Sequence, residues 1–101
     1  MSQSDELLAI SSTEAGLAAT GEIDAHTAPA LAAAIEAAGP DVQLDLSGVE
    51  FVDSSGLRVL IDSHQRLAEA GGGLRLTALS DPVRRLLEIS GVSEYLGVED
   101  T

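Results

Sequence analysis

Two patterns of apolar residues divide the chain into strands and helices. Apolar residues that alternate with polar or small ones indicate strands with one buried face. This pattern occurs around 8–10, 17–19, 42–46 and 74–78, and a final extended piece is expected around 95–98. Apolar residues three and four positions apart indicate amphipathic helices. That spacing occurs in 26–40, 53–70 and 81–90.

The resulting order, β-β-α-β-α-β-α-β, predicts an α/β fold. We expect a mixed, partly parallel sheet of about four to five strands with helices packed against it. The unit from Val42 to Ala78 should hold parallel strands with a right-handed crossover. With 101 residues and no repeat or linker, the chain is expected to form a single domain spanning 1–101.

The helical spacing also predicts which residues face the core. In the first helix these are Leu31, Ala34, Ile35 and Ala38; in the second Leu57, Leu60, Ile61, His64, Leu67 and Ala68; in the third Val83, Leu86 and Leu87. Leu74, Leu76 and Ala78 are expected on one face of their strand. Thr27 and Asp81 are the predicted N-caps of the first and third helices.

Charge is distributed unevenly along the chain. The net charge is −12, and no Lys or Arg precedes Arg58, so the stretch up to Leu57 carries −10 and the remainder −2. Such a surface repels phosphate backbones and anionic lipid headgroups, which argues against nucleic-acid and membrane binding. The same surface would attract a basic protein partner, although it would also serve solubility alone.

Further absences limit the cellular setting and the chemistry. The chain has no Cys, which excludes thiol nucleophiles and suits a reducing compartment. No apolar run approaches the roughly 18 residues of a membrane span. The first ten residues, MSQSDELLAI, are acidic where a signal peptide would be basic. We therefore expect a soluble cytoplasmic protein.

The stretch DSSG, residues 53–56, is the strongest candidate for a site. It follows a strand and opens a helix, at the end of a parallel strand where α/β sheets usually carry their sites. Asp and Ser are favoured N-caps, which would explain one polar residue here. Three polar residues run together, however, so capping and a functional serine both stay open.

Catalysis by this chain is not expected. His64 lies ten residues after Ser54, roughly 15 Å along a helix, and His26 could approach a serine only through the fold. Glu22 and Asp24 could share a cation but lack a visible third ligand, and the glycines at 71–73 lack the lysine of a phosphate-binding loop. We predict no enzyme activity, no metal and no cofactor, and infer that the serine is acted upon, since a helix N-terminus accommodates a phosphate.

Three segments, GEIDAHTA, VDSSGL and SDPVRRLLEISGV, together resemble the STAS family and most closely its stand-alone anti-sigma factor antagonists. The resemblance runs from GEIDAHTAPAL to SGVSEYLGV, nearly the whole chain. It implies a STAS-like fold and a partner switch. The unphosphorylated antagonist binds an anti-sigma factor that is also a serine kinase, the kinase phosphorylates the first serine of the motif, and a serine phosphatase restores it.

Carried onto this sequence, the resemblance makes Ser54 the phosphorylated residue, with Ser55 as the alternative. It implies that Asp53, Ser55, Gly56 and Leu57 shape the loop that binds the partner, and that Asp24 and Thr27 line the same face. Helix phase alone places Ser55 outward and Ser54 nearer the core edge, so the choice of Ser54 rests on the resemblance. Other STAS proteins are subunits of lipid-transport ATPases or of sensory signalling complexes, and this alternative stays open.

Overall fold

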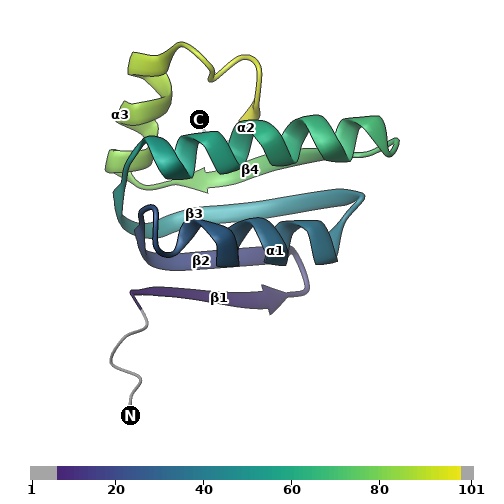
Figure 1. The fold of residues 1–101 in the computed structure, drawn as a ribbon, viewed down its shortest axis with the longest axis horizontal. Helices are drawn as coiled ribbons and strands as arrows, with labels where there is room; N and C mark the ends of the chain where they lie inside the picture. The colour runs from purple at the N-terminus through teal and green to yellow at the C-terminus, as the bar shows by residue number, and fades with distance from the viewer. Residues whose placement is uncertain (1–6, 99–101) are drawn as a thin grey trace.

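A computed structural model describes residues 7–98, which form one five-stranded sheet with helices packed against it (Figure 1). The elements in chain order are β1 (Leu8–Thr13), β2 (Gly16–Ile23), α1 (Ala28–Ala38), β3 (Asp41–Val52), α2 (Ser54–Glu69), β4 (Gly73–Leu79), α3 (Asp81–Ser90) and β5 (Gly97–Val98). The predicted order of elements and the α/β class are confirmed. Residues 1–6 and 99–101, which complete the expected domain and include most of the acidic stretch MSQSDELLAI, lie outside the described residues.

The strands lie in the sheet in the order in which they occur in the chain. β1 pairs with β2 in the antiparallel sense, and β2, β3, β4 and β5 are parallel to their neighbours. The carboxyl ends of β2, β3 and β4 therefore point to the same edge, at the left of Figure 1. The loops that begin α1, α2 and α3 all leave from this edge, hereafter the carboxyl edge.

An aliphatic core lies between the sheet and the helices. α1 and α2 pack side by side on one face, and α3 lies against β3 beyond the end of β4 (Figure 1). The largest fully buried side chains are Ile, Leu and Val, including Ile23, Leu44 and Leu76 in the strands and Leu31 and Leu60 in the helices. Among the described residues, no helix is long and apolar enough to cross a membrane.

The buried face of α2 differs from the predicted one. The buried residues are Gly56, Leu60, Ser63 and Leu67, whereas Leu57, Ile61 and His64 are half-buried and Ala68 is exposed. Consecutive residues are 100° apart around a helix, and the buried face is rotated from the predicted stripe by somewhat less than this angle. The prediction was wrong because two small residues, glycine and serine, take core positions that an apolar count assigns to leucine and isoleucine.

Two predicted core positions in other elements are also corrected. On β4 the third inward residue is Leu79 and not Ala78, because a register irregularity in the pairing with β3 moves the inward position by one residue. In α1, Leu31 and Ile35 are buried as expected, but Ala38 is exposed at the end of the helix.

The helix caps depart from the sequence prediction in two places. Thr27 occupies the N-cap position of α1, but its side chain makes no capping hydrogen bond. The N-cap of α3 is Ser80, whose hydroxyl accepts from the backbone N–H of Val83, so Asp81 is the first helical residue and not the cap. Pro82 follows in the first turn and Gly91 ends the helix with a left-handed backbone.

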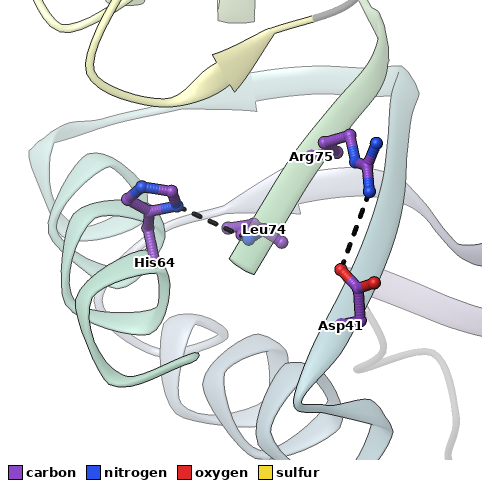
Figure 2. Close-up of polar contacts among 4 residues, drawn as sticks. All are labelled: Asp41, His64, Leu74 and Arg75. Atoms are coloured by element: carbon purple, nitrogen blue, oxygen red, sulfur yellow. Dashed lines mark hydrogen bonds and ion pairs between the residues drawn. The ribbon is translucent and has the colours of Figure 1, made fainter. Parts of the chain in front are cut away.

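Polar contacts join the far end of α2 and the start of β3 to β4. The Nδ1 atom of His64 accepts a hydrogen bond from the backbone N–H of Leu74 at 3.4 Å, and Arg75 forms an ion pair with Asp41 at 3.8 Å (Figure 2). The ring of His64 also packs edge-to-face on Tyr95, with centroids 5.1 Å apart. His64 is thus a structural residue that connects α2, β4 and the C-terminal turn.

Candidate functional site

Asp53 caps α2 and leaves the next residue free. Its backbone is extended, and its Oδ1 accepts from the backbone N–H of Ser55 at 2.8 Å. Its carbonyl accepts from the N–H groups of Gly56 and Leu57 at 3.0 and 3.2 Å. The capping role that three polar residues could have shared therefore falls to Asp53 alone. Ser54 follows as the first helical residue, and within residues 7–98 its hydroxyl has no hydrogen-bond partner.

Exposure distinguishes the two serines. The side chain of Ser54 is exposed, whereas Ser55 is half-buried. This reverses the order expected from helix phase, and the reason is the rotated core face of α2. Since Gly56 and Leu60 are on the buried side, Ser54 lies about 160° from Gly56 and about 120° from Leu60 around the helix axis and faces solvent. The structure therefore presents the Ser54 hydroxyl to a macromolecular partner more openly than that of Ser55.

Gly56 allows α2 to begin close to the sheet. A Cβ atom at this position would lie 2.7 Å from the Cγ2 atoms of both Ile23 and Val52. Glycine is therefore required by close packing, as the last residue of β2 and the last residue of β3 meet the first turn of α2. The backbone N–H of Asp53 also donates to the carbonyl of Ile23 at 3.2 Å. These contacts set the position of Ser54 relative to the β2–α1 loop.

The β2–α1 loop, residues 24–27, is held by its own side chains. The Oδ1 atom of Asp24 accepts from the backbone N–H groups of His26 and Thr27 at 2.9 and 3.0 Å. These N–H groups, with Thr27 contributing most, hold the pKa of the Asp24 carboxyl below its ordinary value. Asp24 is half-buried and stays anionic at neutral pH, so it adds a fixed negative charge to the carboxyl edge.

Thr27 fastens this loop from inside. Its side chain is 7% exposed. The hydroxyl donates to the carbonyl of Glu22 at 2.9 Å and accepts from the N–H of Asp24 at 2.9 Å. Thr27 therefore shapes the face on which Asp24 lies, but its own hydroxyl is occupied within the loop.

A shallow hollow runs along the outer side of α2 from Ser54, and the sequence prediction missed it. It is lined by Ser54, Leu57, Arg58, Ile61 and Asp62, and is called the α2 groove below. Leu57 and Ile61 are only half-buried and form its apolar floor, with charged residues on the exposed side. Apolar periodicity had assigned both residues to the core. With Leu57 and Ile61, the apolar stripe of α2 is wider than the face that the sheet can bury. That extra width was the sequence signal of a second apolar face on this helix.

The geometry does not assemble a catalytic or metal site around Ser54. His64 is bonded to β4, and His26 contributes its backbone N–H to the Asp24 carboxylate. Within residues 7–98, no group of three or more His, Cys, Asp or Glu side chains is placed to hold a metal ion. What the carboxyl edge offers is an accessible hydroxyl beside an apolar groove and two carboxylates that cap backbone N–H groups.

Comparison with known proteins places these features in a family context. A family model described as "Mlab, STAS domain" matches residues 7–98. The chain is 37% identical over 84 residues to an anti-sigma-B factor antagonist of Listeria monocytogenes, covering 79% of this chain and 74% of that protein. It is 32% identical over 81 residues to the anti-sigma-B factor antagonist of Bacillus subtilis, covering 77% of this chain and 74% of the relative. A crystal structure of an anti-sigma factor antagonist from Mycobacterium paratuberculosis superimposes with a TM-score of 0.75 at 30% identity, covering 93% of this chain and 85% of that one.

Proposed function

The chain belongs to the STAS domain family, and we propose that it acts as an anti-sigma factor antagonist switched by phosphorylation of Ser54. In this role it regulates by binding and carries out no catalysis of its own. Its partners are an anti-sigma factor with serine kinase activity, which phosphorylates it, and a serine phosphatase, which reverses the modification. The observation that carries the assignment of the site is the exposed Ser54, whose hydroxyl makes no hydrogen bond to any described residue, at the first helical position of α2.

The kinase supplies the chemistry. The Ser54 oxygen forms a bond to the γ-phosphorus of ATP, the bond to the β-γ bridging oxygen breaks, and ADP leaves. The hydroxyl proton passes to a base on the kinase. The phosphate adds about −1.5 to −2 charges near neutral pH, and the adjacent helix N-terminus accommodates them. The fold therefore tolerates the modification while the surface changes strongly.

The α2 groove and the carboxyl edge form the proposed partner surface. Leu57 and Ile61 supply apolar contact area next to Ser54, and Asp24 and Asp53 add negative charge on the same edge. An anti-sigma factor with a basic binding face would be attracted to this surface in the unphosphorylated state. A phosphate at Ser54 brings bound water to the rim of the α2 groove, and this water must be removed when the partner binds. It also occupies space that the partner needs, so the complex is weakened.

Phosphorylation assays with point variants test the site. The wild type, Ser54→Ala and Ser55→Ala are incubated with the cognate kinase and ATP, and the modified residue is mapped by peptide mass spectrometry. We expect phosphate on the peptide that contains residue 54, loss of labelling in Ser54→Ala and retention in Ser55→Ala. Undiminished labelling of Ser54→Ala would overturn the site. A stable partner complex whose affinity does not respond to phosphorylation would instead indicate a fixed subunit of a transport or sensory assembly.

A further inference from the structure

The chain has five arginines and no lysine, and most of the arginines are engaged within the fold. Arg66 pairs with Glu36 at 3.6 Å, Arg75 pairs with Asp41 at 3.8 Å, and Arg84 donates to the carbonyl of Leu79 at 3.5 Å. Arg58 is exposed and makes no ion pair or hydrogen bond with any described side chain or carbonyl. A cation without a partner among residues 7–98, in a protein of net charge −12, is available for another anion.

The place of Arg58 on α2 directs it toward the modified serine. Arg58 is four residues after Ser54, one helical turn along the same face, and both residues line the α2 groove. Helical side chains lean toward the N-terminus of their helix, so the guanidinium of Arg58 can reach back over the preceding turn. Its five N–H donors in a planar fork match the oxygens of a phosphate.

The carboxylates near Arg58 compete only weakly with a phosphate for its guanidinium. Asp62 lies one turn further along α2 but forms no ion pair with Arg58 within the described residues. Asp53 and Asp24 each use a carboxylate oxygen for backbone N–H groups of their own loops. These three carboxylates are weaker competitors for the guanidinium than a phosphate dianion, because a phosphoserine carries more charge and offers three acceptor oxygens.

We propose that Arg58 binds the phosphate of phosphorylated Ser54 and is the residue that completes the switched state. The inference rests on the proposed function, since it requires Ser54 to be the modified residue. In the unphosphorylated protein Arg58 is an open cation at the rim of the α2 groove. After modification, the Arg58 guanidinium binds the phosphate. The resulting ion pair lies across the end of the α2 groove where Leu57 forms the floor. The switch then makes the partner surface more negative and changes its shape at the same time.

The test uses phosphoserine incorporated at position 54 during translation, so that no kinase is needed. The second pKa of the phosphate is measured by ³¹P NMR in the wild type, in Arg58→Gln and in Arg66→Gln. Arg66→Gln is the matched control, because it removes one positive charge from the same helix, three turns away from Ser54. We expect the phosphate pKa to be about 0.2–0.4 higher in Arg58→Gln than in the wild type, the size of an exposed pair one helical turn apart. Arg66→Gln should shift it by less than half as much.

An unchanged phosphate pKa in Arg58→Gln, or an equal rise in both variants, would overturn the inference, since neither fits a local contact. These outcomes are separate from failure of the proposed function, which would appear as a kinase that does not label Ser54 at all. A second readout is thermal stability. Incorporated phosphate should raise the melting temperature relative to the unmodified chain more in the wild type than in Arg58→Gln, and the difference should fall at high salt. An equal effect in both proteins would count against the contact.

Discussion

Replacing Gly56 with alanine tests how closely the start of α2 is packed against the sheet. The added methyl group would lie 2.7 Å from the Cγ2 atoms of Ile23 and Val52, closer than carbon atoms pack in folded proteins. Both neighbours are β-branched, so their methyl groups cannot rotate away freely. The helix start or the two strand ends must therefore shift.

The magnitude follows from two opposing terms. Overpacking a buried position destabilises a fold by about 1–3 kcal/mol. Alanine in a helix is favoured over glycine by roughly 0.5–1 kcal/mol, which offsets part of this. The expected net loss in the free energy of unfolding is about 1–2 kcal/mol. Since Ser54 is two residues away, the displaced helix start should also slow its phosphorylation.

Urea unfolding followed by circular dichroism measures the stability change. Gly73→Ala is the control, because a Cβ at Gly73 would meet nothing within 4 Å and the backbone there is not left-handed. We expect Gly73→Ala to change stability by less than about 0.5 kcal/mol. If Gly56→Ala were as stable as the wild type or more so, the close approach of α2 to Ile23 and Val52 would be refuted.

The remaining predictions concern the loop and the groove. Thr27→Val should lower the free energy of unfolding by about 1–3 kcal/mol, because it leaves the Glu22 carbonyl and the Asp24 N–H without their hydrogen-bond partner. In the same urea assay, Thr27→Ser should restore most of this stability. Equal losses in the two variants would show that the hydroxyl plays no role. Because the pKa of Asp24 is lowered in the folded state, its carboxylate stabilises the fold above about pH 4, and this contribution disappears as the pH falls through the lowered value. Thermal melts of Asp24→Asn against wild type should thus differ at pH 6, and the difference should shrink as the pH falls below about 4, whereas a constant difference would contradict the pKa shift. Ile61→Ala should weaken partner binding about tenfold, as measured by calorimetry. It should destabilise the fold less than Leu60→Ala, which truncates a core side chain. A larger loss of stability in Ile61→Ala than in Leu60→Ala would place Ile61 in the core.

The order of elements could be predicted because local signals agreed along the chain. Alternating Val42, Leu44 and Leu46 marked β3, and the helical spacing within 26–40 marked α1. These signals depend on a few neighbouring residues and on which face each side chain takes. They do not contain the register of one strand on another. The irregularity that replaces Ala78 with Leu79 in the core arises from pairing across β3 and β4, so no local pattern could indicate it.

The phase of α2 shows a second limit of sequence patterns. An apolar stripe chose Leu57 and Ile61 over Gly56 and Ser63 because it counts hydrophobicity and not the space available. The sheet ends approach α2 so closely at Gly56 that only the smallest residue fits. Rotating the helix to bury this position turns Ser54 to the surface and leaves Leu57 and Ile61 at the edge.

The candidate site was thus located from the sequence, but its geometry was not. The DSSG stretch was identified by its position after a parallel strand and by the resemblance to STAS proteins. The hydrogen bonds of the first turn were needed to show that Asp53 is the cap, and that the Ser54 hydroxyl has no partner in the part of the chain that the structure describes. Thr27 was assigned to the partner-binding face, whereas its hydroxyl lies inside the loop that shapes this face.

The central claim is that a phosphate at Ser54 turns off binding to the anti-sigma factor. Isothermal titration of the cognate anti-sigma factor kinase with the unmodified chain, and with the chain carrying phosphoserine at position 54, tests it most directly. We predict a measurable complex with the unmodified chain and an affinity at least tenfold lower, about 1.4 kcal/mol, with the phosphorylated chain. Equal affinity for the two forms would contradict the account.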